Sequence, residues 1–206
     1  MPARIILVRH GQTEWNRVER FRGRTEITLD DTGLAQAEAT GARLSQMGLS
    51  AIYSSPLTRA MQTAEAIARQ CGLAVAPFLD IIDVDYGAWQ GLTLAQAQQY
   101  DPQAFAEWRH HPESARFPGG ESLEEVRRRG QRAIDSILPR HADQTVALVT
   151  HVAVCRMLAL HLLDVDSSHF WNVLLDNCGV SIFEMRNGIP VATTINDTCH
   201  LERHQH

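Results

Sequence analysis

The sequence has no surplus of positive charge, and this absence excludes one class of partner. Its formal net charge is -5 at pH 7, whereas non-specific binding to nucleic acid or to an anionic membrane surface requires a dense cationic face. Any anionic ligand must therefore be bound by a local group of cations. We expect no nucleic-acid partner and no membrane partner.

Long hydrophobic runs are also missing. The most apolar stretch of the later sequence, residues 152–163, is interrupted by Arg156 and His161, so it does not match a membrane span of about 20 apolar residues. The apolar run at residues 5–8 is too short for the core of a signal peptide, and Arg9 follows it directly. These features predict a cytoplasmic protein.

Cysteine is scarce and widely spaced. No Cys-x-x-Cys pair occurs, whereas zinc and redox sites have short ligand spacings; the four cysteines are Cys71, Cys155, Cys178 and Cys199. The His-Glu-x-x-His motif of zinc enzymes is absent as well. We expect reduced, mostly buried thiols and no metal ion.

What remains is an ordinary globular composition. The chain has 206 residues, of which 44% are hydrophobic and 21% charged. This length suits one domain over residues 1–206, with room for a small helical cap.

Strand and helix patterns alternate along the chain. Short apolar runs predict strands at residues 4–8, 51–53, 73–77, 145–149, 180–183 and 191–195. Helical patterns lie at residues 31–47, 59–70, from 94, near 103, 123–138 and 152–163. This alternation predicts an α/β fold with a mostly parallel sheet covered on both faces, and an antiparallel contribution near the end.

Local signals mark several element ends. Pro56 suits the first turn of a helix capped by Ser54 or Ser55. Ser122 and Glu125 have the spacing of a capping box. The dipeptide at residues 187–188 is Asn-Gly, a hairpin turn signal.

Two histidines follow predicted strands, at the edge where such sheets bind ligands. His10 follows the first strand and His151 follows the strand at 145–149. A single histidine usually satisfies a local hydrogen bond. A neutral imidazole can instead attack phosphorus through one nitrogen if a carbonyl holds the proton of the other. Gly11 would permit such a close backbone approach.

Two arginines strengthen the phosphate interpretation. Arg9 is adjacent to His10, and Arg59 opens the predicted helix after the Ser-Ser-Pro segment at 54–56. Two guanidinium groups that converge on one pocket suit a phosphate dianion. Phosphoryl transfer depends mainly on positioning and charge stabilisation, so such a cluster could support it.

Five ordered segments carry a family resemblance: LVRHGQTEWN, SSPLTRAMQTA, YGAWQGLT, PGGES and VTHVAV. Together they resemble the histidine phosphatase superfamily, in its phosphoglycerate mutase-like branch, over nearly the whole chain. The resemblance implies a three-layer αβα sandwich with a small helical cap formed around residues 12–30 and 83–120. It also implies a phosphate acceptor at His10 and a phosphate pocket made of Arg9, Arg59 and His151, with further donors from the side chain of Asn16 and the backbone amide of Val152.

The general acid departs from the family pattern. Many relatives have glutamate four residues before the glycine that corresponds to Gly87, and here that position is Asp83. The resemblance therefore assigns to Asp83 the transfer of a proton to the leaving alkoxide and the later activation of water. Asp85 is an alternative, because an extended segment would send both side chains to one side. Asp80 is a weaker contender.

Residues that contact the leaving group are less defined. Arg22 lies in a segment that resembles the family's rim loop, where glutamine is frequent; it binds a substrate carboxylate or second phosphate, or it is a solvent-exposed charge. The aromatic residues of the cap region line an apolar surface over the leaving group or belong to the core; they are Tyr86, Trp89, Phe105 and Trp108.

The resemblance implies a phosphomonoesterase that hydrolyses a small phosphorylated metabolite through a phosphohistidine at His10. Mutases of this family typically carry a longer insertion before the PGGES-like region and a C-terminal tail, and this chain is short in that region. A cofactor-dependent phosphoglycerate mutase is the alternative, and only then would 2,3-bisphosphoglycerate be a cofactor. A non-catalytic binder of a phosphorylated ligand is a third reading. Both a monomer and a homodimer remain open.

Overall fold

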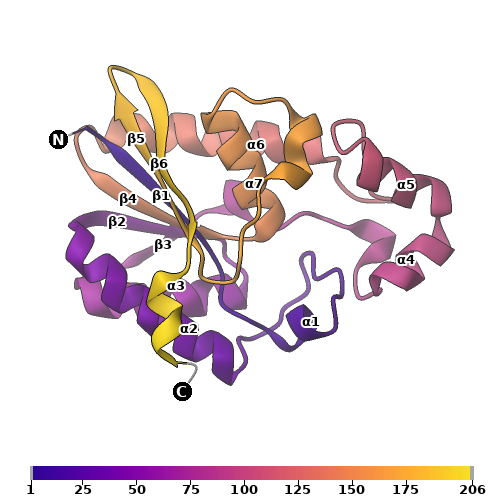
Figure 1. The fold of residues 1–206 in the computed structure, drawn as a ribbon, viewed down its shortest axis with the longest axis horizontal. Coiled ribbons are helices and arrows are strands. Elements are labelled where there is room, and N and C mark those ends of the chain that lie inside the picture. The colour runs from indigo at the N-terminus through magenta and orange to yellow at the C-terminus, as the bar shows by residue number, and fades with distance from the viewer. Residues whose placement is uncertain (1, 205–206) are drawn as a thin grey trace.

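A computed structural model describes residues 2–204, which contain a six-stranded sheet (Figure 1). The strands are β1 (Arg4–Arg9), β2 (Leu49–Ser54), β3 (Val75–Pro77), β4 (Thr145–Thr150), β5 (Val180–Arg186) and β6 (Ile189–Asp197). Their order is β3-β2-β4-β1-β5-β6. The first four in this order run parallel, while β5 and β6 pair antiparallel. The predicted fold class is confirmed.

Helices cover both faces of the sheet. Those of the described chain are α1 (Glu14–Arg17), α2 (Asp31–Leu44), α3 (Thr58–Cys71), α4 (Leu94–Tyr100), α5 (Pro102–His110), α6 (Leu123–Ile137) and α7 (Val152–Leu162). In Figure 1, α2 and α3 lie below the sheet, α6 and α7 lie above it, and α4 and α5 extend to the right. Within residues 2–204, none of the helices has the length and apolarity that a membrane crossing needs.

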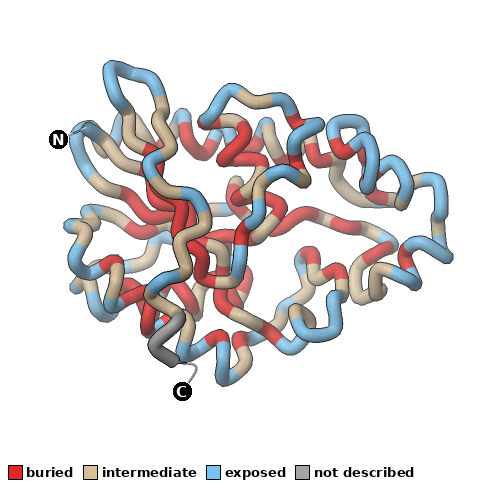
Figure 2. The backbone as a smooth tube through the Cα atoms, in the orientation of Figure 1, coloured by how far each residue is buried: buried red, intermediate tan, exposed pale blue. Residues whose placement is uncertain are grey.

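The core follows the alternation of side chains along each strand. In β1, Ile5 and Leu7 pack in the cluster that includes α6 and α7, whereas Ile6 and Val8 pack against α3. Figure 2 shows this buried band through the centre of the molecule. Burial of one such side chain contributes about 1.5–3 kcal/mol, so β1 is anchored from both faces.

The sheet register brings three strand ends together. Arg9 of β1 pairs with Thr150 of β4, and the backbone N–H of His10 donates to the Thr150 carbonyl at 2.9 Å. At the end of β2, the N–H of Ser55 donates to the Val149 carbonyl at 2.9 Å. Polar residues that are distant in the sequence therefore meet at one edge of the sheet.

Most of the predicted element ends are confirmed. Ser122 and Glu125 form the capping box of α6, and β5 and β6 are joined by a turn at 187–188. The thiols of Cys155 and Cys178 are buried, and burial raises the pKa of each to about 12. Cys71 is only half-buried and Cys199 is exposed, so the expectation of mostly buried thiols holds for two of the four.

One predicted helix start is wrong. Helix α3 begins at Thr58 with Leu57 at its cap position, so Pro56 precedes the helix. The serine hydroxyls have other partners. The Oγ of Ser54 donates to the Ser55 carbonyl, and the Oγ of Ser55 lies 2.7 Å from Nε2 of His151. A serine assigned to a helix cap thus contacts the candidate site.

Candidate active site

His10 is fully buried directly after β1, and its hydrogen bonding defines its tautomer. Its Nδ1 lies 2.7 Å from the backbone oxygen of Gly11. A carbonyl can only accept, so Nδ1 carries the ring proton. Within residues 2–204, Nε2 is buried and has no hydrogen-bond partner. Its lone pair is therefore not engaged by any other group of the described chain.

His151 lies beside His10 at the cap position of α7. The two ring centroids are 5.2 Å apart. Nε2 of His151 contacts the Ser55 hydroxyl, while its Nδ1 is 3.5 Å from Oδ2 of Asp83. The predicted meeting of the two histidines is thus present in the structure, and the Nδ1 side of His151 is directed towards the candidate acid.

Arg59 joins this group from the first turn of α3, where it is fully buried. Its terminal nitrogens donate to the carbonyls of Gly23 at 2.7 Å and Thr25 at 2.9 Å. Nη2 also donates to Oδ2 of Asp83 at 2.8 Å. Arg59 is therefore not a solvent-exposed helix charge.

Arg9 and Arg22 add two more guanidinium groups. Nη1 of Arg9 donates to the Leu175 carbonyl at 2.7 Å, and Nη1 of Arg22 donates to the Trp15 carbonyl at 3.3 Å. In the described chain, the buried Nε of each has no partner. Burial, together with Arg22, lowers the pKa of Arg9 to about 10, so it stays charged at neutral pH. Arg22 is half-buried rather than solvent-exposed.

The buried arginines also affect the pKa values of the two histidines. Burial lowers the pKa of His10 and of His151 well below the usual value, and the charge of Arg59 is the next cause in both cases. Both rings are therefore neutral at physiological pH. For His10, this keeps Nε2 unprotonated, as a nucleophile requires.

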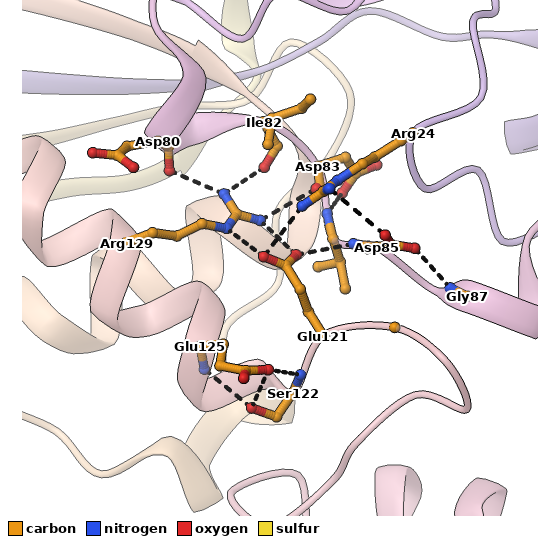
Figure 3. A network of polar contacts seen from close by, with 12 residues as sticks. Arg24, Asp80, Ile82, Asp83, Asp85, Gly87, Glu121, Ser122, Glu125 and Arg129 are labelled. Carbon is orange, nitrogen blue, oxygen red and sulfur yellow. Dashed lines mark hydrogen bonds and ion pairs between the residues drawn. The ribbon is translucent and has the colours of Figure 1, made fainter.

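The three candidate aspartates point in different directions. Asp83 is buried, and its Oδ1 accepts from the Val84 N–H while Oδ2 faces Arg59. Figure 3 shows that the Asp85 carboxylate turns away to accept from the N–H of Gly87 at 2.9 Å.

The expectation that Asp83 and Asp85 share one side is wrong, because the chain here is irregular and lies between two 3-10 turns. Asp80 pairs with Arg132 at 3.2 Å on the surface instead. Of the three carboxylates, only that of Asp83 contacts Arg59 and His151.

A pocket of about 300 Å³ adjoins this cluster through Arg9 and Arg22, and Asn16 and Val152 also line it. Thr13 donates to Oδ1 of Asn16 from both its N–H and its hydroxyl. These bonds use the amide oxygen and leave the amide nitrogen as a donor. Val152 begins α7, where the first N–H groups lack helical acceptors.

The pocket wall contains residues that the sequence did not single out. They are Glu19, Arg20, Phe21, Leu94, Arg109, Ala153, Arg156, Phe170 and Trp171. Arg156 lies over the rings of Phe170 and Trp171, and Arg109 lies over Trp171. A signal for Arg156 was present, since it is a charged residue within the apolar pattern of α7.

The aromatic residues of the cap region all pack in the core, and two of them also line the pocket. Tyr86 and Trp108 belong to the buried cluster and form part of the pocket wall. Trp89 is fully buried, and Phe105 packs against the same core cluster. Among residues 2–204, no group of three His, Cys, Asp or Glu side chains could hold a metal ion.

A family comparison agrees with this geometry. The model of the histidine phosphatase superfamily (branch 1) matches residues 5–198. The chain belongs to this superfamily. The match contains every residue of the cluster described above.

Relatives with assigned names lie close in sequence and structure. Phosphoserine phosphatase 1 of Hydrogenobacter thermophilus is 37% identical over 198 residues, or 96% of this histidine phosphatase and 94% of that protein. The metal-independent phosphoserine phosphatase of Arabidopsis thaliana is 32% identical over 200 residues, or 96% and 82% of the two chains. The crystal structure of an Entamoeba histolytica phosphoserine phosphatase mutant in complex with phosphoserine has a TM-score of 0.88 and 27% identity, covering 97% and 99%.

Other relatives differ in name or length. A probable phosphoglycerate mutase of Yersinia pestis is 30% identical over 203 residues, which are 96% of this chain and 94% of that protein. Three mycobacterial relatives are longer, and this chain spans 55% of their length.

Proposed function

We propose that this histidine phosphatase hydrolyses a small phosphomonoester through a covalent phosphohistidine at His10. The observation that carries the proposal is the buried Nε2 of His10, which has no partner in the described chain and lies beside His151 and a group of arginines. Phosphatase names among the relatives support the same activity.

In the first step, Nε2 of His10 attacks phosphorus and a new N–P bond forms while the ester P–O bond breaks. Arg9 and Arg59 balance the negative charge of the phosphoryl oxygens. His151, Asn16 and the amide of Val152 contribute further donors. The Nδ1–H of His10 keeps donating to the Gly11 carbonyl, and this hydrogen bond stabilises the positive charge that develops on the ring.

Asp83 donates and accepts the proton that is transferred in each step. In its acid form it protonates the oxygen of the departing alcohol and becomes a carboxylate. In the second step the carboxylate takes a proton from water, and the water oxygen attacks phosphorus. The N–P bond breaks, inorganic phosphate leaves, and His10 and Asp83 return to their starting states. No step requires a metal ion, and we propose that the enzyme is metal-independent, like its Arabidopsis relative by name.

The pocket wall favours an anionic leaving group. Beyond the arginines beside His10, it presents Arg20, Arg109 and Arg156 and one carboxylate, that of Glu19. A phosphate dianion alone does not need so many cations. We propose a substrate whose alcohol carries a carboxylate or a second phosphate, a class to which phosphoserine and the phosphoglycerates belong.

The decisive experiment compares His10→Ala with wild type on p-nitrophenyl phosphate. We expect kcat/KM to fall by at least about 10³-fold, because the nucleophile is removed. His111→Ala is the matched control, since His111 is exposed. Rapid quenching should trap a base-stable, acid-labile phosphohistidine in wild type alone. Turnover by the His10 variant at the wild-type rate would refute the proposal.

Two further assays separate the alternatives. A mutase would transfer phosphate from 2,3-bisphosphoglycerate to a monophosphoglycerate, whereas a phosphatase releases inorganic phosphate from both. A binder would retain phosphate in the pocket without turnover of any phosphomonoester. We expect release of inorganic phosphate to exceed mutase transfer.

A further inference from the structure

Arg129 of α6 is a buried cation next to the segment that carries Asp83, and it is only 6% exposed. Its Nη1 donates to the carbonyls of Asp80 at 2.9 Å and Ile82 at 2.6 Å, and its Nη2 donates to the Asp83 carbonyl at 3.2 Å. Figure 3 shows the guanidinium between these carbonyls and the Glu121 carboxylate. The Arg129 side chain thus hydrogen-bonds to three of the four backbone carbonyls of residues 80–83.

Glu121, from the PGGES segment, completes this arrangement. Its oxygens accept from Nε and Nη2 of Arg129 at 3.1 and 3.2 Å. Oε2 also accepts from the N–H of Asp85 at 3.0 Å, and Oε1 lies 3.2 Å from Nη2 of Arg24. Glu121 therefore joins three elements: α6, the segment after Asp83, and the rim segment that contains Arg24.

Glycine permits the approach of these backbones. The N–H of Glu121 donates to the Asp85 carbonyl at 2.9 Å. A Cβ atom at Gly120 would overlap that carbonyl oxygen, and a Cβ atom at Gly87 would overlap the carbonyl of Pro118. The PGGES segment thus packs backbone to backbone on the residues that follow the candidate acid.

We propose that Arg129 and Glu121 are positioning residues that hold the backbone of residues 80–85 so that the carboxyl group of Asp83 faces His151 and the phosphate pocket. The proposal rests on the proposed role of Asp83 as general acid. Neither positioning side chain contacts His10 or Arg59 within the described hydrogen bonds.

A stabilising role alone explains this pair poorly. Desolvation of the buried Arg129 and the half-buried Glu121 offsets much of their attraction, so this ion pair is weak support for stability. The bidentate geometry is instead directional, because the planar guanidinium fits a carboxylate and several carbonyls at once. Asp83 has one methylene less than glutamate, so its reach depends more on where its backbone lies.

The test exploits leaving-group chemistry. p-Nitrophenolate departs without a proton, whereas the alkoxide of glycerol phosphate requires one, so loss of acid catalysis affects the alkyl ester far more. The Asp83→Asn variant measures the effect of losing the proposed acid completely. Its kcat/KM on glycerol phosphate should fall about 10²-fold more than on p-nitrophenyl phosphate.

Arg129→Lys and Glu121→Gln should also lower kcat/KM more on glycerol phosphate than on p-nitrophenyl phosphate, but by a smaller factor than Asp83→Asn. We expect a fall of about tenfold on glycerol phosphate and of at most about twofold on p-nitrophenyl phosphate, because a displaced acid acts poorly while the nucleophile is intact. Arg132→Ala is the matched control. It removes an exposed ion pair to Asp80 of the same segment and should change neither value.

Equal losses on both substrates in the two variants would show a purely structural role and overturn the proposal. If Arg129→Lys does not fold, the selectivity of Glu121→Gln decides alone. Absence of selectivity in Asp83→Asn would instead refute the acid assignment and, with it, this inference. Selectivity in Asp83→Asn without selectivity in the other two variants would refute only the positioning role.

Discussion

Nη2 of Arg59 lies 2.8 Å from Oδ2 of Asp83, and both side chains are buried next to His151. The same guanidinium donates to two carbonyls of the rim segment, at Gly23 and Thr25. A single arginine therefore connects the phosphate pocket, the candidate acid and the rim. This arrangement distinguishes Asp83 from Asp85, which the alternation of side chains in an extended segment left as alternatives.

Asparagine substitutions should separate the two aspartates. Asp83→Asn removes the proposed proton donor, so kcat/KM on an alkyl phosphate at neutral pH should fall by about 10²- to 10³-fold. Asp85→Asn should cost less than about fivefold, since that carboxylate accepts from the Gly87 N–H outside the cluster. Steady-state kinetics of both variants decide the matter, and a larger loss for Asp85→Asn would reverse the assignment.

The two buried histidines predict a fall in stability below neutral pH. The folded state lowers the pKa of His10 and of His151, whereas in the unfolded chain each titrates near a pKa of about 6.5. As pH falls below that value, the unfolded chain binds protons that the folded protein excludes. The free energy of unfolding should then decrease with a slope that approaches ~1.4 kcal/mol per pH unit for each histidine.

Urea unfolding between pH 7 and about 5.5 measures this slope in a range above the titration of ordinary carboxylates. The double variant His10→Gln/His151→Gln should show a shallower dependence than wild type. An unchanged slope would mean that the two rings do not exclude protons in the folded state.

Arg156 should contribute to the choice of substrate. Its Nε donates to the Val173 carbonyl, and its guanidinium stacks over Phe170 and Trp171 in the pocket wall. We expect Arg156→Met to raise KM for phosphoserine about tenfold and to change KM for p-nitrophenyl phosphate by at most about twofold, because only the former carries a carboxylate. The exposed Arg17→Met is the control. Equal changes on both substrates would contradict a role in recognition.

Two adjacent glycines should respond differently to alanine. Gly119 has φ +70°, with open space at its Cβ position, so Gly119→Ala should cost about 1–2 kcal/mol of stability and leave kcat/KM unchanged. The Cβ atom introduced by Gly120→Ala would overlap the Asp85 carbonyl oxygen. We expect the free energy of unfolding to fall by about 1–3 kcal/mol, together with a fall in kcat/KM on alkyl phosphates. Thermal unfolding and kinetics test both, and unchanged kinetics in Gly120→Ala would contradict close packing there.

The sheet and the two histidines were predictable because they depend on local pattern. Buried strands read as apolar runs, and parallel strands present their carboxyl ends at one edge. The pocket wall was not predictable in this way. Arg109 and Arg156 come from different helices and approach the same ring, that of Trp171, only through tertiary packing. The apolar pattern of α7 marked Arg156 as unusual, but nothing local in the sequence distinguishes Arg109 from a surface charge.

Competition between partners explains the remaining differences. Ser55 has the sequence context of a helix cap, yet its hydroxyl contacts His151. The alternation rule for Asp83 and Asp85 assumed an extended strand, whereas the segment is shaped by Arg129 and Glu121 from elsewhere in the chain. At these positions, prediction from local sequence preference fails because a long-range polar contact replaces the expected local one.

The pairing of β1 with β4 also has a consequence for folding. These neighbouring strands are far apart in the sequence, at residues 4–9 and 145–150, so their pairing closes a long loop. The entropy of that loop opposes the contact until the intervening helices have packed. A nascent or truncated chain that lacks β4 has no second imidazole to place beside the first. Recovery of turnover during refolding therefore reports the completion of the central sheet.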